Sequence, residues 1–139
     1  MISCVFYDTL GAPKERQIFE IVQRAYERHE KVVIFVPSAE RASAIDRILW
    51  VLKQEAFLPH RILSQSDADA SVPVGIVTSE INPSGASVLI ADGPCSIDFA
   101  CGFDSVHEFV DRSSAEIQET CRERFRAYRA RQVPVEYSK

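Results

Sequence analysis

The segment that constrains the fold most is the apolar run Lys31-Val32-Val33-Ile34-Phe35-Val36, which is followed by Pro37. Continuous β-branched residues are typical of a strand buried on both faces of a parallel sheet. Apolar residues at helical spacing precede this run, over residues 13–30, and follow it, over residues 38–52. Because strands and helices alternate, the sequence predicts an α/β fold with a mostly parallel sheet and right-handed crossovers.

Five further segments have the composition of strands, and one more has the spacing of a helix. The predicted strands are Ser3–Tyr7, His60–Leu63, Val74–Val77, Ser87–Ala91 and Phe103–Val110. A last helix is predicted from Ser113 or Ser114 to about Arg131, ahead of Pro134. Residues 92–102 carry no clear pattern. A chain of 139 residues suits a single domain, residues 1–139.

The apolar pattern and the cysteines predict a cytoplasmic protein that does not enter a membrane. No apolar run reaches the roughly 18 residues that a membrane span needs, and the first strand meets Asp8 without a basic signal-peptide start. The four cysteines form no C-x-x-C pair. Free thiols in a reducing compartment are expected, and a disulfide between Cys95 and Cys101 is the alternative.

Motifs for nucleotide or metal chemistry are missing from the sequence. The turn Asp8-Thr9-Leu10-Gly11-Ala12-Pro13 holds one glycine and no phosphate-binding fingerprint. The three histidines are scattered without metal-ligand spacing, so no metal or other cofactor is expected. A non-catalytic protein is therefore favoured. The alternative is an enzyme, a degenerate nucleotide-binding or hydrolase domain that uses the region Asp92–His107, which also contains Asp98 and Asp104.

Positive charge gathers at the end of an otherwise acidic chain. Residues 1–112 carry ten Lys and Arg against sixteen Asp and Glu, whereas residues 113–139 carry six against four. Between Cys121 and Arg131 there are five arginines and one glutamate. An acidic body is not typical of a general nucleic-acid binder. The basic end instead indicates a local site for a negatively charged partner.

An apolar stripe and a basic stripe lie side by side on the last predicted helix. The apolar stripe consists of Ile117, Cys121, Phe125 and Tyr128, and the basic stripe of Arg122, Arg126 and Arg129. A peptide with acidic and hydrophobic groups fits such an edge, because a guanidinium can fork a carboxylate beside an apolar side chain. The alternative is a solvated face whose arginines complement the helix dipole.

A second candidate surface is aromatic. Trp50 lies near the end of the second predicted helix, and Phe57 follows it in the segment Phe57-Leu58-Pro59-His60. Aromatic side chains often anchor protein interfaces. The alternative is that both rings cover the core.

These two features, in this order, give the chain a recognisable pattern. It resembles the chi-subunit family of bacterial DNA polymerase III over most of its length, least from Ser64 to Gly102. The matching segments are Phe6-Tyr7, Lys31-Val32-Val33-Ile34, Ile45-Asp46-Arg47-Ile48-Leu49-Trp50, Phe57-Leu58-Pro59-His60 and Arg122-Glu123-Arg124-Phe125-Arg126-Ala127-Tyr128-Arg129.

The resemblance implies an accessory subunit of the clamp-loader complex, with a Rossmann-like three-layer fold that lacks the nucleotide-binding glycine loop. Such proteins hold the acidic-hydrophobic C-terminal tail of single-stranded-DNA-binding protein, and they bind the psi subunit through a second surface. By this resemblance, Arg122, Phe125, Arg126 and Arg129 belong to the tail site, with Val110 as a wall. The same resemblance places Trp50 and Phe57 on the psi side. DNA is then reached only through partners.

The sequence departs from the family pattern at the tail site. The family often has tyrosine at the position of Phe125, and a basic position one turn before Arg122 is Gln118 here. Direct binding of single-stranded DNA through the arginine helix, with Phe125 or Tyr128 stacking on bases, is a third possibility. The acidic body argues against it.

Overall fold

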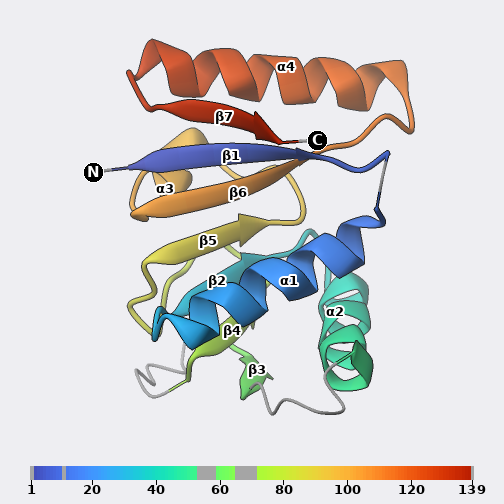
Figure 1. Ribbon diagram of the computed structural model, residues 1–139, viewed down its shortest axis with the longest axis vertical. Helices are drawn as coiled ribbons and strands as arrows, with labels where there is room; N and C mark the ends of the chain where they lie inside the picture. Colours follow the sequence, from blue (N-terminus) through green and yellow to red (C-terminus); the bar gives the residue numbers. More distant parts are fainter. Residues whose placement is uncertain (1, 11, 53–58, 65–71, 139) are drawn as a thin grey trace.

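The structure, a computed structural model, describes residues 2–10, 12–52, 59–64 and 72–138 (Figure 1). Within these residues four helices and seven strands follow one another along the chain. They are β1 (Ser3–Asp8), α1 (Lys14–Glu27), β2 (Val32–Phe35), α2 (Ala39–Leu52), β3 (His60–Ile62), β4 (Val74–Val77), β5 (Val88–Ala91), α3 (Ile97–Ala100), β6 (Ser105–Val110), α4 (Ala115–Ala130) and β7 (Val135–Ser138). No helix in these ranges is long and apolar enough to cross a bilayer.

The strands form one sheet in the order β3-β4-β2-β5-β6-β1-β7. Every strand pair among the described residues is parallel, which confirms the predicted parallel sheet. The apolar run around Ile34 forms β2 between β4 and β5, and all four residues of this strand are buried. Val74–Val77 and Val88–Ala91 therefore flank a shared neighbour and do not pair with each other.

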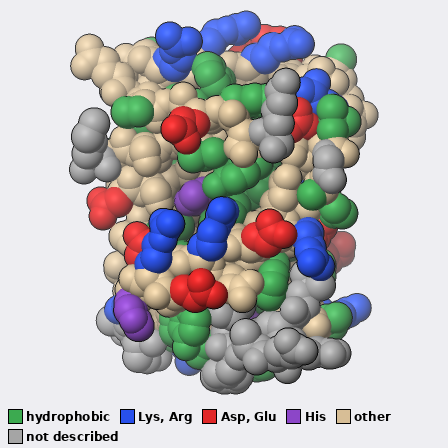
Figure 2. Space-filling model, in the orientation of Figure 1, with side chains coloured by type: hydrophobic (Ala, Val, Ile, Leu, Met, Phe, Trp, Pro, Cys, Tyr) green, Lys and Arg blue, Asp and Glu red, His purple; other side chains and the backbone are tan. Residues whose placement is uncertain are grey.

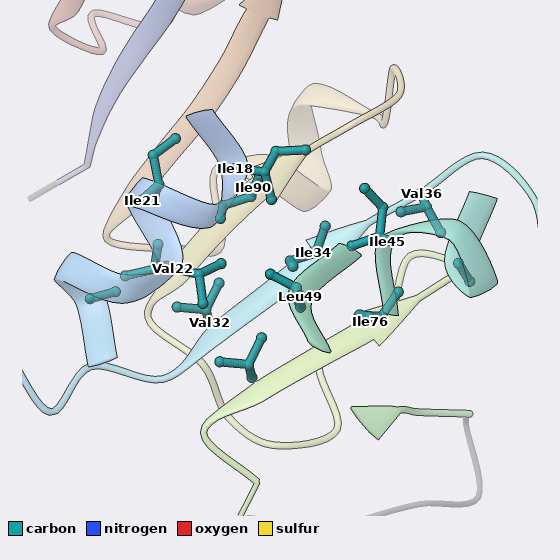
Figure 3. Packing of buried hydrophobic residues seen from close by; sticks show 14 of the residues in the cluster. Ile18, Ile21, Val22, Val32, Ile34, Val36, Ile45, Leu49, Ile76 and Ile90 are labelled. Carbon is teal, nitrogen blue, oxygen red and sulfur yellow. The ribbon is translucent and has the colours of Figure 1, made fainter. Parts of the chain in front are cut away.

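Helices cover both faces of the sheet, which gives the expected three-layer, Rossmann-like architecture. Ile18 and Val22 of α1 pack with Ile45 and Leu49 of α2 over the central strands (Figure 3). On the opposite face, Tyr128 of α4 packs with Ala100 at the end of α3 and with residues of β1 and β6. Alternate residues of β2 join the two clusters, because successive side chains in a strand point to opposite faces.

Two short elements were not predicted from the sequence. The first, α3, is four residues long and begins after Ser96, whose hydroxyl accepts a hydrogen bond from the Phe99 N–H. The second, β7, follows Pro134 and pairs with β1 at the edge of the sheet. Such short elements carry too few residues for a periodic pattern, and β7 is held by its pairing with β1.

All four cysteines lie within the described ranges and are unpaired, as expected. Cys4 and Cys95 are buried in the core on the α4 side of the sheet. Burial raises the pKa of the Cys95 thiol to about 11, so this thiol is neutral at physiological pH.

His107 gives the fold a specific pH dependence. Its Nδ1 lies 2.7 Å from the Tyr7 hydroxyl, and burial, followed by the charge of Arg24, lowers its pKa to about 4. The unfolded chain therefore binds one more proton than the folded chain between pH 4 and 6.5, so stability falls as the pH is lowered through this range. Relative to His107→Gln, the wild type should lose about 3 kcal/mol more between pH 7 and 4.

Urea denaturation of both proteins across this pH range measures the difference. Because Glu and Asp residues titrate equally in both, only the difference between the two curves reports on His107. Parallel curves would contradict a half-buried His107 that is neutral in the folded chain.

Candidate functional site

The helix α4 is anchored to the sheet through one inward-facing arginine. Ser114 caps its start by accepting a hydrogen bond from the Ile117 N–H at 3.1 Å. The Arg124 guanidinium forks the carboxylate of Glu108 in β6, with both N–O distances at 2.6 Å. The hydroxyl of Tyr128 donates to the same carboxylate. Burial, and then the charge of Glu108, raises the pKa of Tyr128, so the hydroxyl keeps its proton.

This anchor fixes which way the other arginines of α4 point. Residues two positions from Arg124 lie on a different side of a helix with 3.6 residues per turn. Arg122 and Arg126 are accordingly exposed, with 64% and 67% of their side chains accessible. Basic side chains are seen along the top of the molecule, over α4 (Figure 2). Within the described part of the chain, both arginines form an ion pair with Glu119, at 3.4 and 3.5 Å. Exposed pairs of this kind contribute little, so both guanidinium groups can exchange Glu119 for another carboxylate.

A hollow of about 360 Å³ opens between α4 and the edge of the sheet. Its apolar part includes Phe6 and Phe125, whose ring centroids are 5.5 Å apart. The residues that line it are Phe6, Val110, Arg112, Gln118, Cys121, Arg122, Phe125, Arg126 and Tyr137. The hollow thus joins an apolar surface to three guanidinium groups.

A hydrogen-bonded network forms the part of the hollow away from α4. The Arg112 Nη2 lies 3.0 Å from Oδ2 of Asp8 and 3.2 Å from the Tyr137 hydroxyl. The Tyr137 hydroxyl donates to the same Asp8 oxygen, and the Leu10 N–H donates to Oδ1 at 2.9 Å. Hydrogen bonds from Arg112 and then Tyr137 hold the pKa of Asp8 well below its usual range. Asp8 is therefore a permanent anion that orients Arg112.

Four of the five residues predicted for a tail site line this hollow. They are Val110, Arg122, Phe125 and Arg126. The fifth, Arg129, is exposed on α4 but lies outside the set of described residues that line the hollow. Phe6, Arg112, Cys121 and Tyr137 were not predicted as site residues. Tyr137 could not be found from the pattern because β7 itself was missed.

The predicted aromatic surface lies near β3 and the end of α2. In the sheet, β3 is at the opposite edge from β7, which contributes Tyr137 to the hollow. Trp50 is 49% exposed, and its ring centroid lies 4.6 Å from that of His60. Val51 and Ile62 are also exposed. Phe57 lies outside the described residues. The role of Trp50 and Phe57 in binding a partner stays a prediction.

Three residues of the enzymatic alternative, Asp92, Asp98 and His107, have separate partners. The carboxylate of Asp92 is buried and is forked by Arg41 at 2.7 and 2.8 Å. His107 contacts Tyr7, and Asp98 pairs with Arg131. No group of three or more His, Cys, Asp or Glu residues in the described ranges could hold a metal ion. Asp92 and Arg41 instead tie β5 to α2.

Comparison with known proteins adds an independent finding. The family model described as "DNA polymerase III chi subunit, HolC" matches residues 1–136. The DNA polymerase III subunit chi of Escherichia coli K12 is 28% identical over 116 residues, which is 83% of this chain and 78% of the relative. That of Pseudomonas aeruginosa PAO1 is 28% identical over 117 residues, 84% of this chain and 79% of the relative.

Solved structures confirm the fold alone. The yeast DEAD-box splicing factor Prp28 superposes with a TM-score of 0.66 at 15% identity, over 96% of this chain and 34% of that one. The C-terminal domain of the DEAD-box protein Dbp5 gives a TM-score of 0.55 at 16% identity, over 98% of this chain and 89% of that one. The chain therefore spans about a third of Prp28, and identities this low carry no functional argument.

Proposed function

The chain belongs to the DNA polymerase III chi subunit family, and we propose that it is an adaptor that binds the C-terminal tail of single-stranded-DNA-binding protein. In this proposal it is a non-catalytic, cytoplasmic subunit of the clamp-loader complex, and it reaches DNA only through its partners. The observation that carries the proposal is the hollow beside α4, where an apolar surface meets exposed guanidinium groups.

The apolar part of the hollow suits the last aromatic side chain of the tail. Phe125 and Val110 form its walls, and Phe6 backs Phe125 from β1. Two aromatic rings 5.5 Å apart already have tilted geometry, to which a third ring can add edge-to-face contacts. Because Phe125 carries no hydroxyl, this wall selects by shape and apolar contact.

The guanidinium groups suit the carboxylates of the same tail. Arg122 and Arg126 border the apolar surface and can bind the terminal carboxylate through charge-assisted hydrogen bonds. Arg129 lies one turn beyond Arg126 on α4. Its charge can attract acids that lie farther from the end of the tail. The exposed Trp50 end of α2, together with Phe57, is proposed as the surface for a psi-type partner.

Salt should weaken this interaction, because its charged part is solvent-exposed. Raising the NaCl concentration from about 0.05 to 0.5 M shortens the screening length roughly threefold. The dissociation constant for an acidic peptide ending in phenylalanine should then rise about tenfold. Titration calorimetry at several salt concentrations measures this. A dissociation constant that does not change with salt would contradict the role of the arginines.

The intact partner provides the functional test. Single-stranded-DNA-binding protein should co-elute with this chain in size-exclusion chromatography at low salt, and the same protein lacking its C-terminal tail should not. Equal co-elution of both forms would place the contact elsewhere on the partner and overturn the proposal.

A further inference from the structure

Arg112 borders the same hollow as Arg122 and Arg126 but comes from a different element, the loop between β6 and α4. Hydrogen bonds hold both its side chain and its backbone carbonyl. Asp8 and Tyr137 hold Nη2, and the Gln118 side chain donates to the Arg112 carbonyl at 3.4 Å. The loop is thereby tied to α4, to β7 and to the end of β1.

The side chains of Asp8 and Arg112, which are bonded to each other, differ in solvent exposure. The Asp8 side chain is 9% exposed, whereas that of Arg112 is 41% exposed. Within the described part of the chain, the Arg112 side chain bonds Asp8 and Tyr137 through Nη2. An arginine has five N–H donors in a rigid fork, so Arg112 keeps donors for a ligand while Asp8 fixes its direction.

Because Gln118 is uncharged, the positive charge of Arg112 matters more to the hollow. Gln118 lines the hollow one turn before Arg122. The amide of Gln118 carries no charge, so the early part of α4 contributes none to the hollow. Arg112 is the residue that brings positive charge to this part of the hollow from outside the helix.

We infer that Arg112 is a second carboxylate-binding residue of the site, and that it binds an acidic side chain of the tail upstream of the terminal residue. This inference rests on the proposed function. One terminal carboxylate is bound by Arg122 and Arg126 on α4. An extended peptide advances about 3.3 Å per residue, so an acid a few residues earlier reaches the part of the hollow formed by the β6–α4 loop and β7. Asp8 and Tyr137 act as positioning residues for Arg112.

The test is a calorimetric cycle with two peptides, two Arg112 variants and one control variant. One peptide has acidic residues before a C-terminal phenylalanine, and the other has asparagine at each acidic position. Arg112→Gln should weaken binding of the acidic peptide about tenfold and change binding of the asparagine peptide less than twofold. Arg112→Ala provides a second variant. Arg16→Gln, on an exposed i,i+4 pair of α1, is the control and should bind both peptides as the wild type does.

The possible outcomes separate the inference about Arg112 from the proposed function. If the wild type binds the acidic peptide and both Arg112 variants bind it equally well, the inference about Arg112 is overturned while the proposed function stands. An equal loss for both peptides would also overturn it, since Arg112 would then act on the terminal carboxylate or on the fold. If the wild type binds neither peptide, the proposed function itself fails.

Discussion

Replacing Arg124 with alanine should destabilise the protein by about 3–5 kcal/mol, because it leaves a buried carboxylate without its partner. Glu108 is 5% exposed, and its two oxygens are both bound by the Arg124 guanidinium. Tyr128, which donates to the same carboxylate, is fully buried. The substitution therefore removes two charge-assisted hydrogen bonds at the contact that holds α4 against β6.

Urea denaturation measures this effect, and Arg126→Ala is the matched control. It removes the same side chain two residues along the same helix, from a position that is exposed, and should change stability by less than about 0.5 kcal/mol. The double variant Arg124→Met with Glu108→Leu should regain much of the lost stability, because it removes the unpaired charge. Equal unfolding midpoints for Arg124→Ala and Arg126→Ala would show that the Glu108 pair does not anchor α4.

Reversing the charge of Arg122 should weaken tail binding about a hundredfold, which is close to 3 kcal/mol. Arg122→Glu removes a donor beside the apolar wall and places a negative charge where the terminal carboxylate is proposed to lie. The loss of a charge-assisted hydrogen bond accounts for about 1–3 kcal/mol, and repulsion adds to it. The fold should be unaffected, since Arg122 is exposed and its ion pair among the described residues is the exposed one with Glu119.

Calorimetry with the acidic peptide, together with thermal unfolding, checks both parts of this prediction. Arg16→Glu is the matched control, because it makes the same change in net charge on α1 and should leave the dissociation constant within about twofold of the wild type. If the two variants weaken binding equally, the effect comes from overall charge, and the site is not where the hollow lies.

Much of the fold follows from patterns in the sequence. The run around Ile34 is buried on both faces as predicted, and the helices start where Ser38 and Ser114 offer a capping hydroxyl. These patterns are local, so a sequence carries them directly. The order of the strands is different. Pairing of β1 with both β6 and β7 joins residues more than a hundred positions apart, and no local pattern encodes it.

The candidate site likewise has one part that local patterns predict and another that they do not. The apolar and basic stripes on α4 could be predicted from helical spacing, and the structure places Arg122, Phe125 and Arg126 around one hollow. The part formed by Arg112 and Tyr137 could not, because it depends on how β7 joins the sheet. Helical spacing already left Arg124 out of the predicted basic stripe. Its role as an internal anchor bound to Glu108, in contrast to its exposed neighbours, is shown only by the structure.

The central claim is that the hollow beside α4 binds the acidic-hydrophobic end of a peptide. The most direct measurement is a calorimetric titration of the wild-type chain with an acidic peptide that ends in phenylalanine with a free carboxylate. One peptide should bind per chain, and the same peptide with a C-terminal amide, or without the phenylalanine, should bind at least tenfold more weakly. No binding of the free-acid peptide, or equal binding of all three peptides, would contradict the account.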